Sequence, residues 1–343
     1  MDTVTAARQP HEVLSWGRDV LDPALRAAVG TLPGAVRNVA EFHLGWCDAD
    51  GAPASASGGK AIRPTLTLLA AEAAGGVSEA GLPGAVAVEL VHNFSLLHDD
   101  VMDEDVLRRH RPTAWSVFGV GPAILAGDAL LTLAFDTLAA GGGERARDGV
   151  RMLSATVQDL VDGQSADLAF EERDDVSLAE CLSMARAKTG SLLGCACGLG
   201  ELFATGDRTR IEHMRMFGER LGIAFQLVDD VLGIWGDPAL TGKAIHSDIS
   251  ARKKSLPVVA ALTSDTGPGR ELALLYASSE PLSAADVASA AALVTASGGR
   301  AWSEAEAARQ LAGALDDLRR AAASGRAAAE LEALARLVTT RDR

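Results

Sequence analysis

The feature that most constrains the fold of this chain is a succession of long segments with helical apolar spacing. Apolar residues recur every three to four positions over 85–102, 122–140 and 208–235, which places them on one face of a helix. The sequence shows no convincing strand-like alternation, no strand–helix–strand rhythm and no repeat at a fixed period. We therefore predict one large all-α domain over residues 1–343, with 1–15 as a polar, flexible arm.

The predicted elements follow this spacing from the arm to the end of the chain. Segments 48–59 and 75–84 are rich in small and turn-forming residues and are predicted as loops. The predicted helices lie at about 20–34, 35–47, 64–74, 85–102, 112–118, 122–140, 145–171, 178–204, 208–235, 255–263, 269–277, 285–297, 302–323 and 326–339.

Composition and charge narrow the functional classes. Hydrophobic residues make up 48% of the chain but aromatic residues only 4%, which favours closely packed helices over a β-sandwich. The formal net charge of -14 would repel a nucleic-acid backbone and gives no attraction to an anionic membrane. The beginning of the chain lacks the pattern of a signal peptide, and no run of about 18 uncharged apolar residues indicates a transmembrane segment. The predicted location is the cytoplasm.

The first acidic motif, HNFSLLHDDVMDED, lies at the end of an apolar helical stretch. Asp99 and Asp103 are four residues apart and therefore share one helix face, with Asp100 between them. Carboxylates this close repel each other, and a hard cation such as Mg²⁺ relieves the repulsion by binding carboxylate and phosphate oxygens together. Glu104 and Asp105 add negative charge where the helix dipole disfavours it. The motif therefore favours metal binding over a purely structural role.

A second acidic pair, Asp229 and Asp230, follows another apolar helical stretch in FQLVDDVLGIWGD. One such motif alone is as well explained by a solvated helix end. Two of them, each at the end of an apolar helix and each followed by basic residues, indicate a shared function.

Basic residues follow or flank these motifs in short clusters. Arg binds diphosphate oxygens in a bidentate fork and Lys supplies a point charge, while metal ions bridge further oxygens. A lone Lys or Arg is usually a surface charge, but this clustering predicts a diphosphate site. The cations are Arg108, Arg109, His110 and Arg111 after the first motif, Lys243, Arg252, Lys253 and Lys254 after the second, and Lys60, Arg63 and Lys188 elsewhere.

Five segments in order, over roughly 58–257, resemble the trans-isoprenyl diphosphate synthase (polyprenyl synthetase) family. GGKAIRP resembles the family's isopentenyl diphosphate segment, and LLHDDVMDEDVLRRHRPT its first aspartate-rich motif. GQSADL, with Gln164 and Asp167, resembles a further motif, and KTG and FQLVDDVLGIWGDPALTGKAIHSDISARKKSLP resemble its later ones. The resemblance implies a bundle of mostly antiparallel helices around a deep central pocket, usually as a homodimer.

The resemblance also implies roles for individual residues. Two magnesium ions on Asp99 and Asp103, and a third on Asp229, would hold the allylic diphosphate. The residues implied to bind the allylic diphosphate are Arg108, Lys188, Lys243 and Lys253, with Thr189 and Gln226 nearby. Those implied for isopentenyl diphosphate are Lys60, Arg63, His92 and Arg109. The implied catalytic set is Asp99, Asp103, Arg108, Lys188, Asp229 and Lys243.

The implied reaction joins isopentenyl diphosphate to dimethylallyl, geranyl or farnesyl diphosphate. Metals and cations would stabilise the departing diphosphate, and apolar walls would keep water from the allylic cation. The chain departs from the family at the second motif, Asp-Asp-x-x-Asp, whose last position is Gly233. Asp237 lies four residues further on, so the details of the third metal site stay open.

Product length depends on residues upstream of the first motif. Phe94 and Ser95 lie five and four positions before Asp99, a pattern similar to that of family members that make the twenty-carbon product. Phe94 lies about 140° round an ideal helix from Asp99, so an ordinary core position is equally compatible with the pattern. Geranylgeranyl diphosphate is the predicted product, and farnesyl diphosphate is the alternative.

Two other functions would use part of this pattern. A terpene cyclase of the same fold would ionise a prenyl diphosphate without condensing it and would need only one diphosphate site. The presence of Lys60, Arg63, His92 and Arg109 favours condensation, whereas Gly233 leans weakly toward a cyclase. A regulatory subunit would be expected to lack aspartates of the first motif, which are present here.

Overall fold

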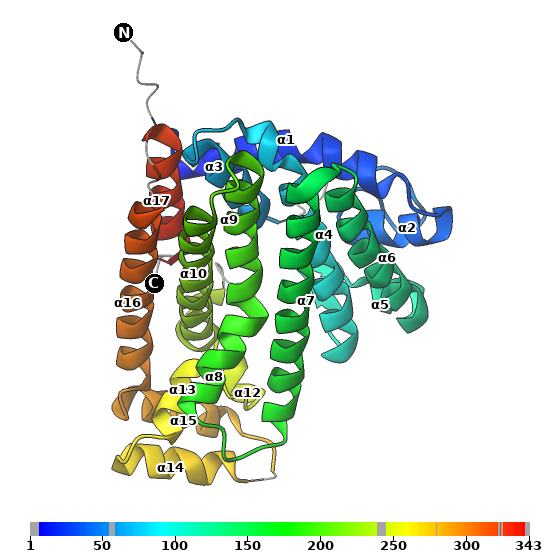
Figure 1. Cartoon of the computed structure of the whole chain (residues 1–343). Helices are drawn as coiled ribbons and strands as arrows, with labels where there is room; N and C mark the ends of the chain where they lie inside the picture. The colour runs from blue at the N-terminus through cyan, green and yellow to red at the C-terminus, as the bar shows by residue number, and fades with distance from the viewer. Residues whose placement is uncertain are drawn as a thin grey trace. The chain divides into compact units, whose positions relative to one another are not determined.

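The computed structural model describes residues 7–54, 59–238, 245–278, 280–321, 323 and 325–339, and it is almost entirely helical (Figure 1). In this part of the chain the strands are β1 (Leu107–Arg108) and β2 (Arg111–Pro112), which pair antiparallel. The predicted all-α fold class is confirmed. Packing divides the chain into two compact units, so the single domain stays a prediction. The first unit is 1–157 with 195–215 and 318–333, and the second is 158–194 with 216–317 and 334–343.

The first unit contains the N-terminal helices, the hairpin and parts of five later helices. Its complete elements besides the hairpin are α1 (Pro10–Val29), α2 (Gly34–His43), α3 (Ile62–Ala73), α4 (Ser78–Met102), α5 (Ala114–Phe118) and α6 (Val120–Ala139). It shares α7 (Gly143–Glu171), α9 (Ser191–Ala204), α10 (Arg208–Trp235) and α17 (Gly325–Thr339) with the second unit, along with the end of α16 (Gly299–Arg320).

Helix α4 is the buried centre of the first unit and packs against α3 and α6. It begins at Ser78, so the predicted loop 75–84 is wrong over most of its length. The error has a packing cause, because Gly81 and Gly84 bring α4 close to α3. A Cβ at Gly81 would lie 3.1 Å from the Thr67 carbonyl oxygen, and one at Gly84 would lie 3.2 Å from the Thr67 Cγ2. This helix contact overrides the turn tendency of the Gly and Pro residues.

The predicted arm is also shorter than expected, because α1 begins at Pro10. Pro stands at the first helical turn, where its missing N–H costs nothing. The Gln9 backbone N–H donates to Glu12 Oε2 at 2.7 Å, which caps the helix start. Val13 is fully buried, so the first turn is held by tertiary packing as well.

The second unit contains the remaining helices. Its elements, besides its shares of α7, α9, α10 and α17, are α8 (Leu178–Ala185), the π-helical turn η1 (Arg186–Gly190), α12 (Ser247–Ser250), α13 (Leu256–Leu262), α14 (Gly267–Tyr276), α15 (Ala284–Ala296) and most of α16 (Gly299–Arg320).

The predicted helix 178–204 is interrupted by η1, which separates α8 from α9. The backbone hydrogen bonds of a π turn span one residue more than those of an α-helix, and such a turn often marks a functional position. The turn lies directly on α7, because a Cβ at Gly163 would come within 2.4 Å of the Lys188 backbone nitrogen. Gly163 therefore allows η1 to approach α7 closely.

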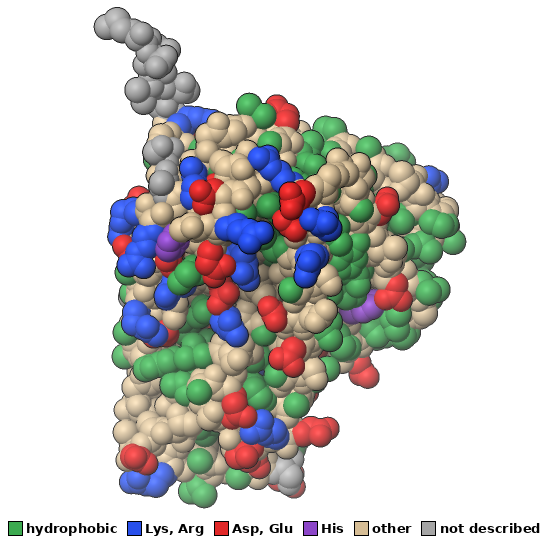
Figure 2. All heavy atoms as spheres, viewed as in Figure 1, with side chains coloured by type: hydrophobic (Ala, Val, Ile, Leu, Met, Phe, Trp, Pro, Cys, Tyr) green, Lys and Arg blue, Asp and Glu red, His purple; other side chains and the backbone are tan. Residues whose placement is uncertain are grey.

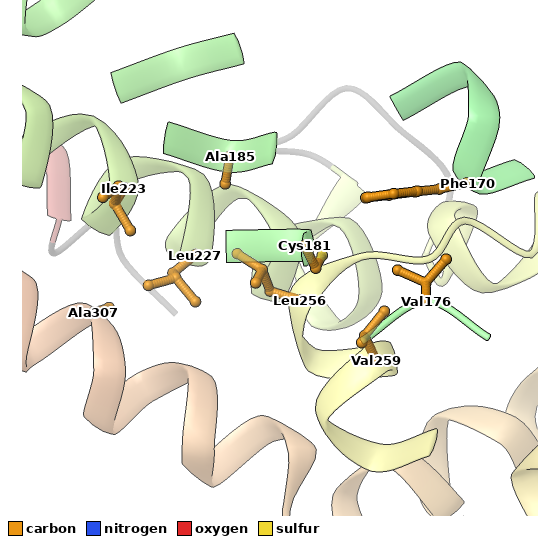
Figure 3. Packing of buried hydrophobic residues seen from close by; sticks show 9 residues of the cluster. All are labelled: Phe170, Val176, Cys181, Ala185, Ile223, Leu227, Leu256, Val259 and Ala307. Atoms are coloured by element: carbon orange, nitrogen blue, oxygen red, sulfur yellow. The ribbon is translucent and has the colours of Figure 1, made fainter. Parts of the chain in front are cut away.

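One apolar core of the second unit joins α7, α8, α10, α13 and α16. Figure 3 shows its side chains gathered between these helices, and the cluster is Phe170, Val176, Cys181, Ala185, Ile223, Leu227, Leu256, Val259 and Ala307. Because this core holds α10 and α13 together, it fixes the start of α13 beside the second acidic motif.

Candidate functional site

The first acidic motif divides into outward and inward carboxylates. Asp99 is partly exposed and Asp103 is exposed at the C-terminal end of α4. Asp100 is 1% exposed, and its Oδ1 accepts a hydrogen bond from Arg108 Nε at 2.5 Å. Asp99 and Asp103 are thus the accessible pair, and Asp100 holds Arg108.

The β1–β2 hairpin presents the basic residues that follow the motif. Arg109 and His110 form its two-residue loop, and both have positive φ, 52° and 63°. Such a loop normally takes Gly or Asn, because a side chain is strained there. This local strain places Arg109 against Gly59, where a Cβ would lie 2.5 Å from the Arg109 Nη1. Gly59 has φ +99°, and the exposed Lys60 follows it directly.

Arg63, His92 and Arg109 form a crowded cluster, in which the two arginines carry the positive charge. Arg63 Nη1 lies 3.3 Å from His92 Nε2. Burial lowers the pKa of Arg63 to about 10, Glu89 opposes this shift, and Arg109 adds to it. Burial, followed by the charges of Arg63 and Arg109, holds the pKa of His92 well below its usual value, so its imidazole is neutral. Like charges held this close favour an anionic ligand.

A pocket next to this cluster has a second neutral histidine in its wall. Burial, with Arg108 and Arg109, lowers the pKa of His43 to about 3, while a hydrogen bond with Asn93 opposes the shift. The lining residues are Phe42, His43, Asn93, Leu96, Asp100, Arg108, Arg109, Arg111, Pro112, Thr113 and Ala114.

Phe94 and Ser95, the predicted determinants of product length, lie on α4. Phe94 is 7% exposed, and its ring meets the His98 ring edge-on with centroids 4.8 Å apart. His98 Nε2 lies 3.1 Å from the Ile124 carbonyl oxygen of α6. Ser95 Oγ donates to the His92 carbonyl oxygen at 2.9 Å. Phe94 therefore lies in the contact between α4 and α6, and its role in product length stays a prediction.

In the second unit, η1 carries Lys188 and Thr189. Lys188 Nζ lies 2.5 Å from Asp167 Oδ2 on α7. Thr189 Oγ1 donates to Gln226 Oε1 at 2.8 Å, and Gln226 Nε2 donates to Asp230 Oδ1 at 2.8 Å. The structure thus brings together four residues singled out from the sequence and links them to Asp230.

The second acidic motif repeats the division seen in the first. Asp229 is exposed, whereas Asp230 is 5% exposed and accepts a hydrogen bond from the Leu256 N–H at 2.9 Å. Burial raises the pKa of Asp230 to about 6, although Lys253 opposes the shift. Burial alone would lower the pKa of Lys253, but Asp230 and Asp167 more than offset that and raise it.

Three further residues singled out from the sequence are Lys243, Asp237 and Gln164. Lys243 lies in 239–244, outside the described residues. Asp237 is exposed just after the end of α10. Gln164 is 7% exposed, and neither polar atom of its amide has a hydrogen-bond partner within the described residues. A buried amide of this kind indicates a bound ligand or water.

Sequence reasoning missed His43, Glu89, Asn93 and Asp248. Glu89 and Asn93 are buried on α4, with Asn93 Nδ2 donating to the Glu89 carbonyl oxygen at 2.8 Å. A polar residue inside an otherwise apolar helix was the available signal for both. His43 and Asp248 stand in segments without a distinctive spacing.

The carboxylates fit Mg²⁺ that is bound together with a diphosphate. Within the described ranges, no three His, Cys, Asp or Glu side chains form a ready-made metal cage. Mg²⁺ commonly takes one or two carboxylates and completes its shell with waters and substrate phosphate oxygens. The outward Asp99 and Asp103 in one unit and Asp229 in the other are donors of this kind.

Comparison with known proteins agrees with this geometry. The family model described as polyprenyl synthetase matches residues 51–294. A (2E,6E)-farnesyl diphosphate synthase of Mycobacterium tuberculosis is 43% identical over 99% of this chain and 96% of its own length. A geranylgeranyl diphosphate synthase of the same organism is 46% identical over 84% of this chain and 82% of its own. The crystal structure of a polyprenyl synthetase from Streptomyces coelicolor superimposes with a TM-score of 0.90 at 46% identity, covering 95% of this chain and 98% of that one.

Proposed function

Because the chain belongs to the polyprenyl synthetase family, we propose that it condenses isopentenyl diphosphate with allylic diphosphates to give a short-chain trans-prenyl diphosphate. The allylic substrates are dimethylallyl, geranyl and farnesyl diphosphate. Geranylgeranyl diphosphate is the proposed product, and farnesyl diphosphate is the alternative, since relatives of both kinds are similar to this chain.

The observation that carries the proposal is the cluster of Arg63, His92 and Arg109. Its two guanidinium groups suit an anion, and they are additional to the outward carboxylates Asp99 and Asp103, which suit a metal-bound diphosphate. Condensation needs two diphosphate sites, whereas a terpene cyclase needs one. The cluster therefore favours the synthase over the cyclase.

The residues then divide into two groups by substrate. Lys60, Arg63, His92 and Arg109 bind isopentenyl diphosphate, and the neutral His92 offers a ring N–H without adding charge. The allylic diphosphate is bound by Arg108, Lys188, Lys243 and Lys253, with Thr189 and Gln226 beside them. Asp99 and Asp103 would hold two magnesium ions and Asp229 a third, and these ions would neutralise charge on the departing diphosphate.

The chain's own cations do the rest of the chemistry. As the allylic carbon–oxygen bond breaks, the diphosphate leaves with the electron pair, and Arg108 and Lys188 stabilise its charge. The double bond of isopentenyl diphosphate attacks the allylic cation and forms the new carbon–carbon bond. The proton lost in the last step goes to the released diphosphate, so no dedicated protein base is required.

A homodimer is the proposed assembly, with α6 in the interface. By length and composition alone, α4 and α6 are both apolar enough to cross a membrane. The most apolar window of α4 is 72% buried, which makes it a core helix, but that of α6 is only 39% buried. Val120, Ile124 and Leu125 are exposed on α6, where Figure 2 shows apolar side chains on the surface. A second copy would cover this face, and we propose a cytoplasmic location for the dimer.

A product assay tests the proposed function. Purified protein is given Mg²⁺ and isopentenyl diphosphate with each allylic diphosphate in turn, and the products are identified by mass. A twenty-carbon diphosphate supports the proposed product, and a fifteen-carbon stop replaces it with the alternative. No condensation, together with conversion of geranylgeranyl diphosphate to a hydrocarbon, would replace the synthase with a cyclase.

A further inference from the structure

Gly233 leaves a gap on α10 that a side chain from elsewhere fills. Gly233 follows Asp229 by four residues, so both lie on one face of the helix. A Cβ built on Gly233 would lie 2.3 Å from Asp248 Oδ2, 2.6 Å from its Cγ and 2.8 Å from its Oδ1. The carboxyl group of Asp248 therefore occupies the space that a side chain at position 233 would need.

The two oxygens of Asp248 lie within the reach of an aspartate at 233. In an aspartate, two bonds separate each carboxylate oxygen from the Cβ. The resulting distance is similar to the 2.3 and 2.8 Å between the Asp248 oxygens and a Cβ built on Gly233. An aspartate at 233 and the present position of Asp248 exclude each other. The missing carboxylate of the motif is thus matched by a carboxylate from another segment.

A fixed turn delivers Asp248 to this position. The backbone N–H of His246 donates to the Ile234 carbonyl oxygen at 3.1 Å, and its Nδ1 lies 2.6 Å from the same oxygen. Ser247 Oγ donates to the Gly233 carbonyl oxygen at 3.3 Å. His246 has φ 60°, a conformation that needs support from its surroundings. These bonds tie α12 to the last turn of α10 and leave Asp248 only 9% exposed.

Asp248 also shares the electrostatic surroundings of the second motif. The ammonium of Lys253 interacts electrostatically with Asp230, Asp167, Asp248 and Asp229. Asp248 and Asp229 therefore act on the same cation within the second unit.

We infer that Asp248 supplies the last carboxylate of the second acidic motif and faces the third magnesium ion together with Asp229. The inference rests on the proposed function, because that function places a magnesium ion at Asp229. Two carboxylates with phosphate oxygens and waters are a donor set that Mg²⁺ accepts. Gly233 is then required at its position, since it makes room for Asp248.

Metal binding tests the inference without relying on turnover. Mn²⁺ is titrated into the full chain with inorganic diphosphate, and bound ions are counted from the loss of the free Mn²⁺ signal in electron paramagnetic resonance. Asp248→Asn should bind one ion fewer than the wild type, or bind its weakest ion at least about tenfold more weakly. Asp237→Asn is the matched control and should titrate like the wild type. Gly233→Asp combined with Asp248→Ala should restore the lost ion, which separates ligand loss from misfolding.

The outcomes distinguish this inference from the proposed function. If Asp248→Asn titrates like the wild type while Asp99→Ala loses ions, the role of Asp248 is wrong and the proposed function stands. If Asp237→Asn loses the ion instead, the carboxylate has been assigned to the wrong residue. If the wild type itself binds no Mn²⁺ with diphosphate, the proposed magnesium sites are wrong, and so is the role of Asp248 in one of them.

Discussion

Arg108 Nε lies 2.5 Å from Oδ1 of Asp100, so the middle carboxylate of the first acidic motif binds a side chain of the hairpin. Asp100 is almost fully buried, whereas Asp99 and Asp103 are accessible. One motif would therefore have two roles: Asp99 and Asp103 are the proposed metal ligands, and Asp100 orients the arginine that follows.

Replacing Asp100 should affect catalysis without affecting metal binding. Asp100→Asn keeps the shape of the side chain but removes the charge that holds Arg108. A hydrogen bond to a charged group contributes about 1.5–3 kcal/mol, so kcat/KM should fall by roughly 10- to 100-fold. Bound Mn²⁺ should be unchanged. The control is Asp175→Asn in the exposed Arg173–Asp175 pair, which should change neither quantity. Loss of bound Mn²⁺ in Asp100→Asn would make Asp100 a ligand instead.

Removing either outward carboxylate should abolish turnover and leave the fold intact. Asp99→Ala and Asp103→Ala each take away a proposed metal ligand, and metal stabilisation of the leaving diphosphate is worth several kcal/mol. We expect kcat to fall by at least about 1000-fold, with an unchanged circular dichroism spectrum. Chelation of Mg²⁺ should have the same effect on the wild type. Asp105→Asn, next to the motif, is the control. Near-native activity in either alanine variant would remove that residue from the metal site.

Phe94→Ala should lengthen the product if Phe94 closes the pocket. Phe94 is buried against His98, so its loss should also cost about 3–5 kcal/mol of stability. Leu97→Ala is the matched control, because Leu97 is fully buried on the same helix and its truncation costs a comparable amount. Product mass with isopentenyl and farnesyl diphosphate separates the two effects. A longer product from both variants, or from neither, would assign product length to other residues.

His43 should make stability depend on pH. Its pKa in the folded state, about 3, lies below the usual 6.5, so the unfolded chain binds the proton first as pH falls. The free energy of unfolding should carry the full contribution of His43 above pH 6.5 and lose it as pH falls toward 3, by up to ~1.4 kcal/mol per pH unit. Urea unfolding at several pH values should show a shallower dependence for His43→Gln than for the wild type. Equal slopes would mean that His43 is not held neutral.

Helical spacing predicted most elements well, because long apolar stripes dominate them. The prediction 208–235 coincides with α10. The start of α4 could not be predicted, because Gly81 and Gly84 look like turn residues until their contact with α3 is known. The hairpin was missed because its strands are two residues long and its loop places Arg109 and His110 where Gly or Asn is usual.

The candidate site was predicted by residue type but not by orientation. Asp99 and Asp100 are neighbours in sequence, and only the position of the hairpin beside α4 decides which one turns inward. The same holds for Asp229 and Asp230, whose division depends on the start of α13. The sequence shows that Gly233 lacks the carboxylate of the motif, but only the fold shows that Asp248, from another segment, lies at that position.

The π turn at Arg186–Gly190 makes the length of this segment as important as its composition. Removing one residue would let the turn relax into an ordinary α-helix, in which the flanking helices keep their faces but the wider turn that presents Lys188 and Thr189 is lost. A deletion after Thr189 would thus displace Lys188 from Asp167 and Thr189 from Gln226, although all four residues were still there. Insertions and deletions in this short stretch should therefore be far less tolerated in natural variants than substitutions at its exposed positions.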